Sequence, residues 1–95
     1  MPHFVIDCSA TVLKDIPQEE VISAIHDVAC ASALFAEDEI KIRMRPFETY
    51  VVGGERKDFI HVFGSIMQGR TEAQRAALSR AMVTRLKELF PSVPF

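Results

Sequence analysis

The sequence predicts a small α+β domain, with a β-α-β repeat that forms a mixed sheet and two helices packed on one face. Two observations favour this fold class. Short segments alternate apolar and polar residues, as strands do, and two longer segments carry apolar residues at helical spacing. Along the 95 residues the order is strand, helix, strand, hairpin turn, strand, helix. If each crossover is right-handed, both helices cover the same face. We expect residues 1–95 to form one domain.

The first half of the chain predicts a strand, a helix and a second strand. His3–Ser9 alternates, with Phe4, Ile6 and Cys8 on one face. Pro17 fits the first turn of a helix that we expect to run to about Leu34. Glu39–Arg45 alternates apolar residues with lysine and arginine, and we expect Pro46 to end regular pairing there.

The second half predicts a turn, a strand and a second helix. A short extended segment, Phe47–Val52, leads into Gly53-Gly54, which supplies the positive φ angles of a tight hairpin turn. We expect a strand over Asp58–Met67 with both faces largely buried, and Gly69 to end it. Thr71 has capping-box spacing to Gln74 and begins a helix. Its expected core-facing stripe comprises Leu78, Ala81, Met82, Leu86, Leu89 and Phe90.

The composition excludes some classes of function. A net charge of -2 and a pI of about 5.9 provide no basic field for nucleic acid or an anionic membrane. Because no apolar run approaches the roughly 18 residues of a membrane span and no signal peptide is evident, we expect a cytoplasmic protein. A chain of this size buries a modest core, so oligomerisation would be a natural supplement.

The second residue is a proline that could carry chemistry. If the initiator Met1 is removed, the nitrogen of Pro2 becomes a free secondary amine. An α-amino group titrates near ~8, and burial or nearby positive charge lowers its pKa further. A base that titrates near neutral pH is suited to proton transfer. The alternative is a proline that merely starts a strand.

Three cations could cooperate with such an amine. Arg70 lies between a strand end and a helix N-terminus, where free N–H groups favour an anion, so it could clamp a carboxylate. Lys41 and Arg43 alternate on one strand face, where they would lower the pKa of the amine and bind an acidic substrate. The alternatives are a solvated turn arginine and an ordinary polar face.

The cysteines and histidines indicate less. Cys8 and Cys30 have no metal-ligand spacing, and we expect buried thiols rather than a disulfide or a nucleophile. His61 alternates with phenylalanines, which favours a hydrogen-bonded core histidine over a general base. His3 and His26 form no ligand pair with it, so the sequence predicts no metal site.

Three segments together resemble a known family. Pro2–Ser9, Ile40–Arg43 and Gln68–Thr71 are similar to 5-carboxymethyl-2-hydroxymuconate isomerase, a branch of the tautomerase superfamily, and the resemblance extends to about Phe90. It implies a β-α-β fold, usually in trimers whose sheets face inward. It also implies an amino-terminal proline as acid and base, with neither a metal nor an organic cofactor.

The resemblance implies roles for particular residues. Pro2 would move a proton between the enol and keto forms of a small unsaturated carboxylate or dicarboxylate. Arg70 and one of Lys41 and Arg43 would bind carboxylate or polarise the carbonyl. The chain departs from the family in having Lys41 where arginine is usual. It also ends at Phe95, where the family continues with a strand and a tail, so we expect a domain that is short at its C-terminus.

Two other functions stay open at this point. A non-catalytic oligomeric module that binds a small ligand could use the same fold. A ferredoxin-like dimeric small-ligand protein is a further alternative.

Overall fold

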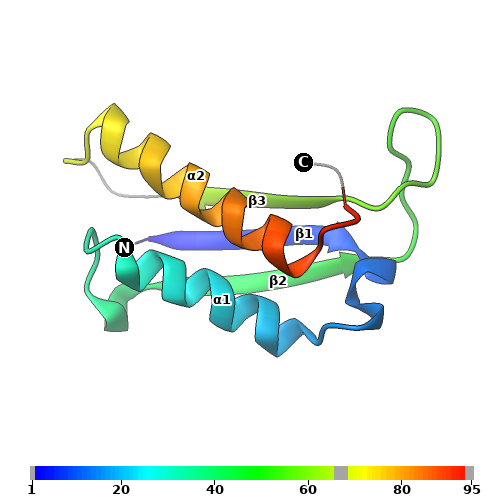
Figure 1. The fold of residues 1–95 in the computed structure, drawn as a ribbon, viewed down its shortest axis with the longest axis horizontal. Helices are drawn as coiled ribbons and strands as arrows, with labels where there is room; N and C mark the ends of the chain where they lie inside the picture. Colours follow the sequence, from blue (N-terminus) through cyan, green and yellow to red (C-terminus); the bar gives the residue numbers. More distant parts are fainter. Residues whose placement is uncertain (1, 66–68, 94–95) are drawn as a thin grey trace.

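The residues that the structure describes form a three-stranded sheet with both α-helices on one face (Figure 1). The computed structural model describes residues 2–65 and 69–93. The elements are β1 His3–Ser9, η1 Ala10–Lys14, α1 Gln18–Ala31, η2 Glu37–Glu39, β2 Lys41–Phe47, β3 Ile60–Ser65 and α2 Glu72–Leu89. The predicted α+β class and the placement of both helices on one face are confirmed. The two short 3-10 helices, η1 and η2, were not predicted.

The first strand of the chain is the middle strand of the sheet. The order is β2-β1-β3, with β2 parallel and β3 antiparallel to β1. Side chains of β1 alternate as expected: Phe4, Ile6 and Cys8 are buried against the helices. The odd-numbered residues therefore point to the other side of the sheet.

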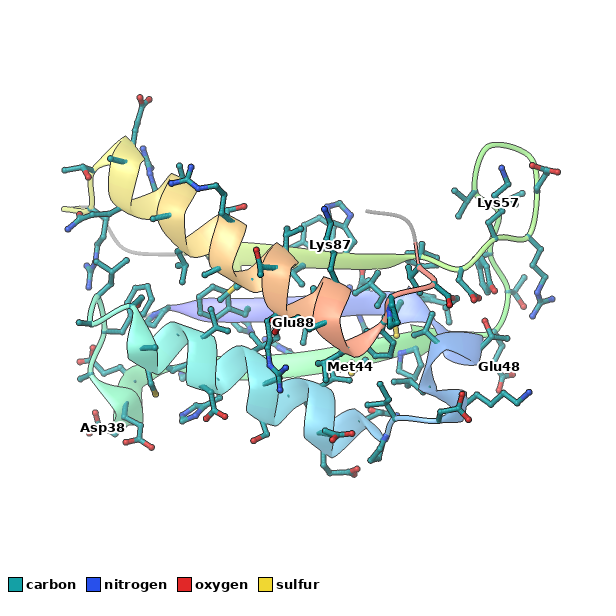
Figure 2. The ribbon with its side chains drawn as sticks, in the orientation of Figure 1. Asp38, Met44, Glu48, Lys57, Lys87 and Glu88 are labelled. Atoms are coloured by element: carbon teal, nitrogen blue, oxygen red, sulfur yellow. The ribbon has the colours of Figure 1, made fainter. Side chains whose placement is uncertain are left out.

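The core lies between the sheet and the helices. Leu78, Met82, Leu86 and Phe90 are buried, as the predicted stripe required, whereas Ala81 is exposed. Burying each large apolar side chain contributes roughly 1.5–3 kcal/mol, so this layer is the main source of stability. Figure 2 shows side chains filling it, while Asp38 and Lys57 extend outward at opposite ends. Among the described residues, no helix combines the length and apolar character that crossing a bilayer requires.

Helix α1 ends earlier than predicted, at Ala31 instead of about Leu34. The Ser32 hydroxyl donates to the Ala29 carbonyl at 2.6 Å, and Ala33 adopts a positive φ of 60°. A left-handed residue cannot continue a right-handed helix, so the chain turns there.

Strand β2 is shifted by two residues from the expected Glu39–Arg45. It begins at Lys41 because η2 occupies Glu37–Glu39, and it continues through Pro46 to Phe47. The prediction that Pro46 ends the pairing is therefore wrong. The Lys41 N–H points toward β1. Backbone N–H groups alternate sides along a strand, so an N–H at position 46 would point away from β1. Because β2 is an edge strand, a missing N–H on that outer side breaks no ladder bond.

The segment between β2 and β3 is mostly irregular. The predicted turn is confirmed, since Gly53 and Gly54 have φ angles of 58° and 81°, but the pairing around it is a single bridge, Val52 to Glu55. The expected extended segment over Phe47–Val52 is therefore largely wrong. This loop is held at its base by aromatic contact, with the Tyr50 and Phe59 ring centroids 5.3 Å apart.

Strand β3 is shorter than the expected Asp58–Met67, since it begins at Ile60, and Met67 lies outside the described residues. The prediction that both its faces are buried is wrong, because His61 and Phe63 are exposed. His61 is thus not a core histidine. It lies against Phe63 instead, with ring centroids 4.2 Å apart, on the face without helices.

The capping box of α2 offers a direct stability test. Thr71 accepts from the Gln74 N–H at 3.1 Å, and the Gln74 side chain accepts from the Thr71 N–H at 2.8 Å. We expect Thr71→Ala to lower the free energy of unfolding by about 1 kcal/mol, or roughly 4–8 °C in Tm. Thr84→Ala, the same change at an exposed position inside α2, is the control and should leave Tm equal or slightly higher. Equal losses in the two variants would contradict the capping role.

Candidate active site at the start of the central strand

Pro2 lies at the start of the central strand and is buried. Its carbonyl accepts a hydrogen bond from the Lys41 N–H at 3.0 Å, which extends the parallel ladder to the second residue. The alternation of β1, continued by one residue, places Pro2 on the same side of the sheet as Phe4. Pro2 is therefore held by the sheet.

Several elements converge at this end of the molecule. β2 begins here because it is parallel to β1, and β3 ends here because it is antiparallel. The end of α1 and the start of α2 lie at the same end, close to the N-terminus in Figure 1. Segments far apart in sequence therefore meet at the end of the molecule where Pro2 lies.

Arg70 lies at this end, on the helix side of the sheet. Its Nη2 donates to the Leu34 carbonyl at 2.6 Å, and its guanidinium carbon is 5.2 Å from the centroid of the Phe35 ring. Phe35 in turn contacts Phe4 edge to face, with centroids 6.2 Å apart. These contacts place the half-buried cation beside the start of α2 and within the layer that contains Phe4.

The other two predicted cations lie on the opposite side of the sheet. We call this surface the open face; it comprises His3, Val5, Asp7, Lys41, Arg43, Arg45, His61, Phe63 and Ser65. Lys41 and Arg43 are both exposed there, while Ile42 between them packs against the core. The structure thus brings Lys41 and Arg43 together, and Lys41 also bonds to Pro2 through its backbone. The contacts of Arg70 with Leu34 and Phe35 lie instead in the layer between the sheet and the helices.

The open face contains two polar pairs that sequence reasoning missed. Arg43 Nε donates to His3 Nε2 at 2.8 Å, and Arg45 Nε lies 3.2 Å from Asp7 Oδ1. Both pairs join β1 to β2. They could have been predicted only from the parallel register of these two strands, which places the partners side by side. Because His3 directly follows Pro2 in the chain, its hydrogen bond holds the Arg43 guanidinium one residue away from Pro2 in sequence.

Neither cysteine is suited to act as a nucleophile. Cys8 is buried as expected, and desolvation with the nearby Asp7 charge raises its pKa to about 11. Cys30 is half-buried; desolvation raises its pKa, and the charges of Glu37 and Asp27 raise it further. Because the thiolate is the reactive form, both side chains are poorly nucleophilic at neutral pH.

A polar cluster lies at the far end of β1. Asp58 accepts hydrogen bonds from Ser9 at 3.3 Å and from Thr11. The Thr11 and Tyr50 hydroxyls are 3.4 Å apart, and this hydrogen bond lowers the pKa of Tyr50. The cluster fastens the loop before β3 and is remote from Pro2.

A groove of ≈ 500 Å³ lies between α2 and β3. Its lining includes Phe4, Val62, Gly64, Leu78 and Met82. A Cβ at Gly64 would come within 3.1 Å of the Phe4 ring, so glycine permits this close approach. The groove reaches the Phe4 end of β1 and offers an apolar surface on the same side of the sheet as Pro2.

Comparison with known proteins agrees with this arrangement. Residues 2–94 match the family described as 5-carboxymethyl-2-hydroxymuconate isomerase. A solved 5-carboxymethyl-2-hydroxymuconate delta-isomerase is similar with a TM-score of 0.84 and 18% identity, covering 96% of this chain and 72% of that chain. A 5-carboxymethyl-2-hydroxymuconate isomerase from Deinococcus radiodurans R1 is similar with a TM-score of 0.84 and 20% identity, covering 96% of this chain and 70% of that chain.

A third solved structure is similar at lower TM-score. Pt0534, inactivated by 2-oxo-3-pentynoate, has a TM-score of 0.71 and 19% identity, covering 96% of this chain and 76% of that chain. Comparison with curated proteins gives no match. At these identities the solved structures show the shared tautomerase fold, and family membership rests on the match over residues 2–94. The chain therefore belongs to the 5-carboxymethyl-2-hydroxymuconate isomerase family, and this membership supports an isomerase-type function.

Proposed function

We propose that this protein is a tautomerase that moves a proton between the enol and keto forms of small unsaturated carboxylates or dicarboxylates, with the amine of Pro2 as acid and base. The observation that carries the proposal is the family match that begins at Pro2, a residue buried at the start of the central strand. In the printed sequence Met1 precedes Pro2, so the amine exists only once Met1 is removed.

The proposed chemistry is a proton shuttle. The neutral amine takes a proton from the enol hydroxyl or from an acidic carbon of the substrate, and the resulting ammonium returns it to another carbon. The composition of the substrate is unchanged, and the amine is regenerated. Burial of Pro2 favours the neutral amine, because desolvation disfavours the charged form. Groups positioned for such proton transfers typically contribute ~10²–10⁴-fold in rate.

We assign the cations to binding the substrate and stabilising negative charge. Arg70 lies on the same side of the sheet as Pro2, where its guanidinium could bind a substrate carboxylate with charge-assisted hydrogen bonds. Lys41 or Arg43 would bind a second carboxylate or polarise the carbonyl as the enolate forms. Because Lys41 and Arg43 are on the open face, we propose that a substrate reaches them where that face meets another subunit.

The role of Pro2 can be tested by intact mass and activity together. We expect the mature chain to begin at Pro2, and Pro2→Ala to lower kcat/KM for 5-carboxymethyl-2-hydroxymuconate by roughly 10²-fold or more, followed by ultraviolet absorbance. Pro91→Ala, an exposed proline after α2, is the matched control and should be unaffected. Full activity in Pro2→Ala, or in a chain that retains Met1, would rule out the mechanism. Ligand binding without turnover would favour the non-catalytic binding module.

A covalent probe gives a second test of Pro2. 2-Oxo-3-pentynoate, which inactivates Pt0534, conjugates a triple bond to a keto group. A neutral amine can add to that bond, with its proton passing to carbon, so the adduct mass equals the sum of the two reactants. We expect one adduct per chain, which peptide mapping places on Pro2, and loss of activity in parallel. An adduct elsewhere, with activity retained, would contradict the assignment.

The role of Arg70 predicts a defect in carboxylate binding. Arg70→Lys keeps the positive charge and loses the planar fork, so we expect kcat/KM to fall roughly 10- to 100-fold, mainly through KM. Arg80→Lys, at an exposed position of α2, is the control. Since Arg70 also bonds to Leu34, Tm is measured for both variants. An unchanged KM at equal Tm would remove Arg70 from the binding site.

We also propose a homo-oligomer that covers the open face, with a trimer favoured because the family resemblance implies one. Phe63 is 49% exposed on this face in the isolated chain, an unusual position for a large apolar side chain flanked by charges. We expect light scattering to give the mass of a trimer, and Phe63→Asp to shift it toward monomer. Val51→Asp, at a loop residue that is 69% exposed, should leave the mass unchanged. A wild-type monomer, or a Phe63→Asp trimer, would show that this face is not the interface.

A further inference from the structure

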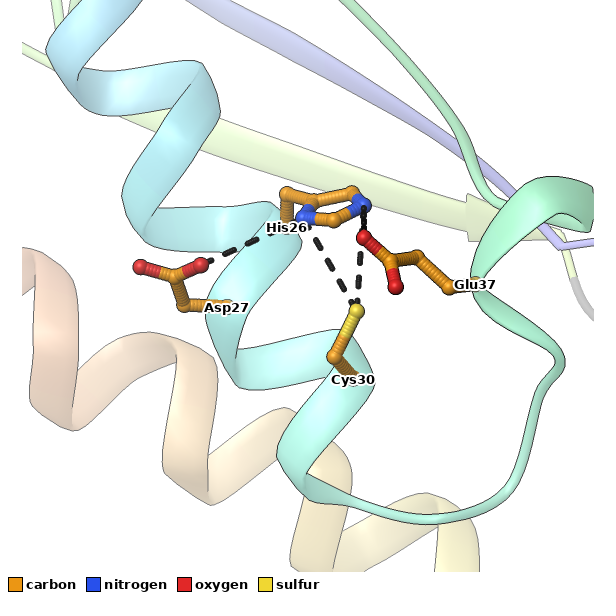
Figure 3. Close-up of polar contacts among 4 residues, drawn as sticks. All are labelled: His26, Asp27, Cys30 and Glu37. Atoms are coloured by element: carbon orange, nitrogen blue, oxygen red, sulfur yellow. Dashed lines mark hydrogen bonds and ion pairs between the residues drawn. The ribbon is translucent and has the colours of Figure 1, made fainter.

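Three side chains with different donor atoms meet on the outer side of α1. His26 and Cys30 are four residues apart on this helix, so they share one of its faces. Glu37 comes from η2, after the chain has turned back past Ala33, and its carboxylate reaches the same place (Figure 3). Helical spacing alone accounts for the first two residues, whereas the third is brought there by the fold of the connection.

The donor atoms have nearly the separations that a tetrahedral metal requires. Cys30 Sγ is 3.7 Å from His26 Nε2, and that nitrogen is 3.9 Å from Glu37 Oε1. One donor atom from each residue lies within 4.8 Å of the other two. With zinc bond lengths of about 2.3 Å to sulfur and 2.0–2.2 Å to nitrogen and oxygen, donors around a tetrahedral ion are about 3.4–3.6 Å apart. The observed separations exceed this range by a few tenths of an ångström to about an ångström, and the imidazole would also have to turn, since Cys30 Sγ is 3.8 Å from Nδ1 as well.

We propose that His26, Cys30 and Glu37 bind a transition metal ion, with Zn²⁺ as the ion that this donor set fits best. Thiolate and imidazole are ligands that zinc prefers, and carboxylate completes sets of this kind. Water fills the fourth position, since His26 and Glu37 retain 33% and 77% exposure of their side chains. Binding releases the Cys30 thiol proton to solvent, so the bound sulfur is a thiolate.

Asp27 supplies an independent observation that points the same way. Its Oδ1 lies 4.0 Å from His26 Nδ1, the ring nitrogen that the proposed metal does not use. Histidines that bind metals usually direct their second nitrogen to a carboxylate, which orients the ring and makes it a better ligand. Among the described residues, the ion pairs of Asp27 and Glu37 are both with His26: Glu37 lies at the nitrogen that would bind the metal, and Asp27 lies at the other one.

The proposed site is separate from the candidate active site, and the metal takes no part in proton transfer. It would instead join the C-terminal part of α1 to η2 across the connection over residues 32–36. That connection carries Leu34 and Phe35, which both contact Arg70. A bound ion would therefore brace the segment against which Arg70 lies, and metal that binds only the folded state would raise Tm.

The test uses the full chain after treatment with a chelator, with Zn²⁺ and Co²⁺ as probes. Calorimetry should give one Zn²⁺ per chain, and Co²⁺ should give the ultraviolet charge-transfer band of a thiolate ligand. Cys30→Ser should abolish that band, and His26→Ala and Glu37→Gln should each weaken binding by more than Asp27→Asn. For Asp27→Asn we expect a loss of roughly 10- to 100-fold.

Matched controls separate this site from incidental binding. Asp38→Asn changes a neighbouring exposed carboxylate of η2, and His3→Ala removes the histidine next to the N-terminus, so both should bind Zn²⁺ like the wild type. Circular dichroism confirms that each variant is folded. Zn²⁺ should raise Tm for the wild type and the two controls, but not for Cys30→Ser. Absence of the thiolate band in the wild type, or Zn²⁺ affinity unchanged in folded Cys30→Ser, would overturn the proposal.

Discussion

The burial of one side of β1 is the constraint on which the rest of this structure depends. Phe4 is 2% exposed, and Ile6 and Cys8 are fully buried, between two partner strands and beneath two helices. Because strand side chains alternate with a period of two, burying these residues forces His3, Val5 and Asp7 to the open face. A slip of one residue would reverse both faces, so the core specifies the register and, through it, the position of Pro2.

The candidate active site is formed where strands and helices begin or end. Parallel pairing brings Lys41 beside Pro2, and antiparallel pairing brings the end of β3 to the same edge. Arg70 arrives from the start of α2 and is held against the segment that follows α1. These contacts lie in the layer between sheet and helices, whereas Lys41 and Arg43 are exposed on the open face, so a substrate that contacts all three cations would have to pass the edge of the sheet. This geometry is a physical reason to connect the proposed activity with assembly.

The connection between α1 and β2 has two roles in our proposals. Its first part contacts Arg70 through Leu34 and Phe35, and its second part carries Glu37 to His26 and Cys30. The turn at Ala33 makes both possible, because it ends the helix early and directs the chain back along it. Family membership bears on the first role through the isomerase-type function. The metal site is independent of that membership and rests on the donor geometry and on the contact of Asp27 with His26.

Local patterns in the sequence were sufficient for much of the fold. Alternation in His3–Ser9 predicted the buried and open sides of β1, and the Thr71 capping box predicted the start of α2. The motifs around Pro2 and Arg70 led to the family that the comparison shows. Each of these signals depends on residues close together in the chain, where periodicity and hydrogen-bonding preferences act directly.

The remaining features were decided by contacts between distant segments. Pro46 is tolerated because β2 is an edge strand, and His61 is exposed because nothing within the described chain covers the open face. The Arg43–His3 bond and the approach of Glu37 to Cys30 depend on strand register and on the path of a connection. The sequence by itself determined which residues alternate, cap and turn; only the tertiary structure decided which of them meet, because that depends on how the elements pack.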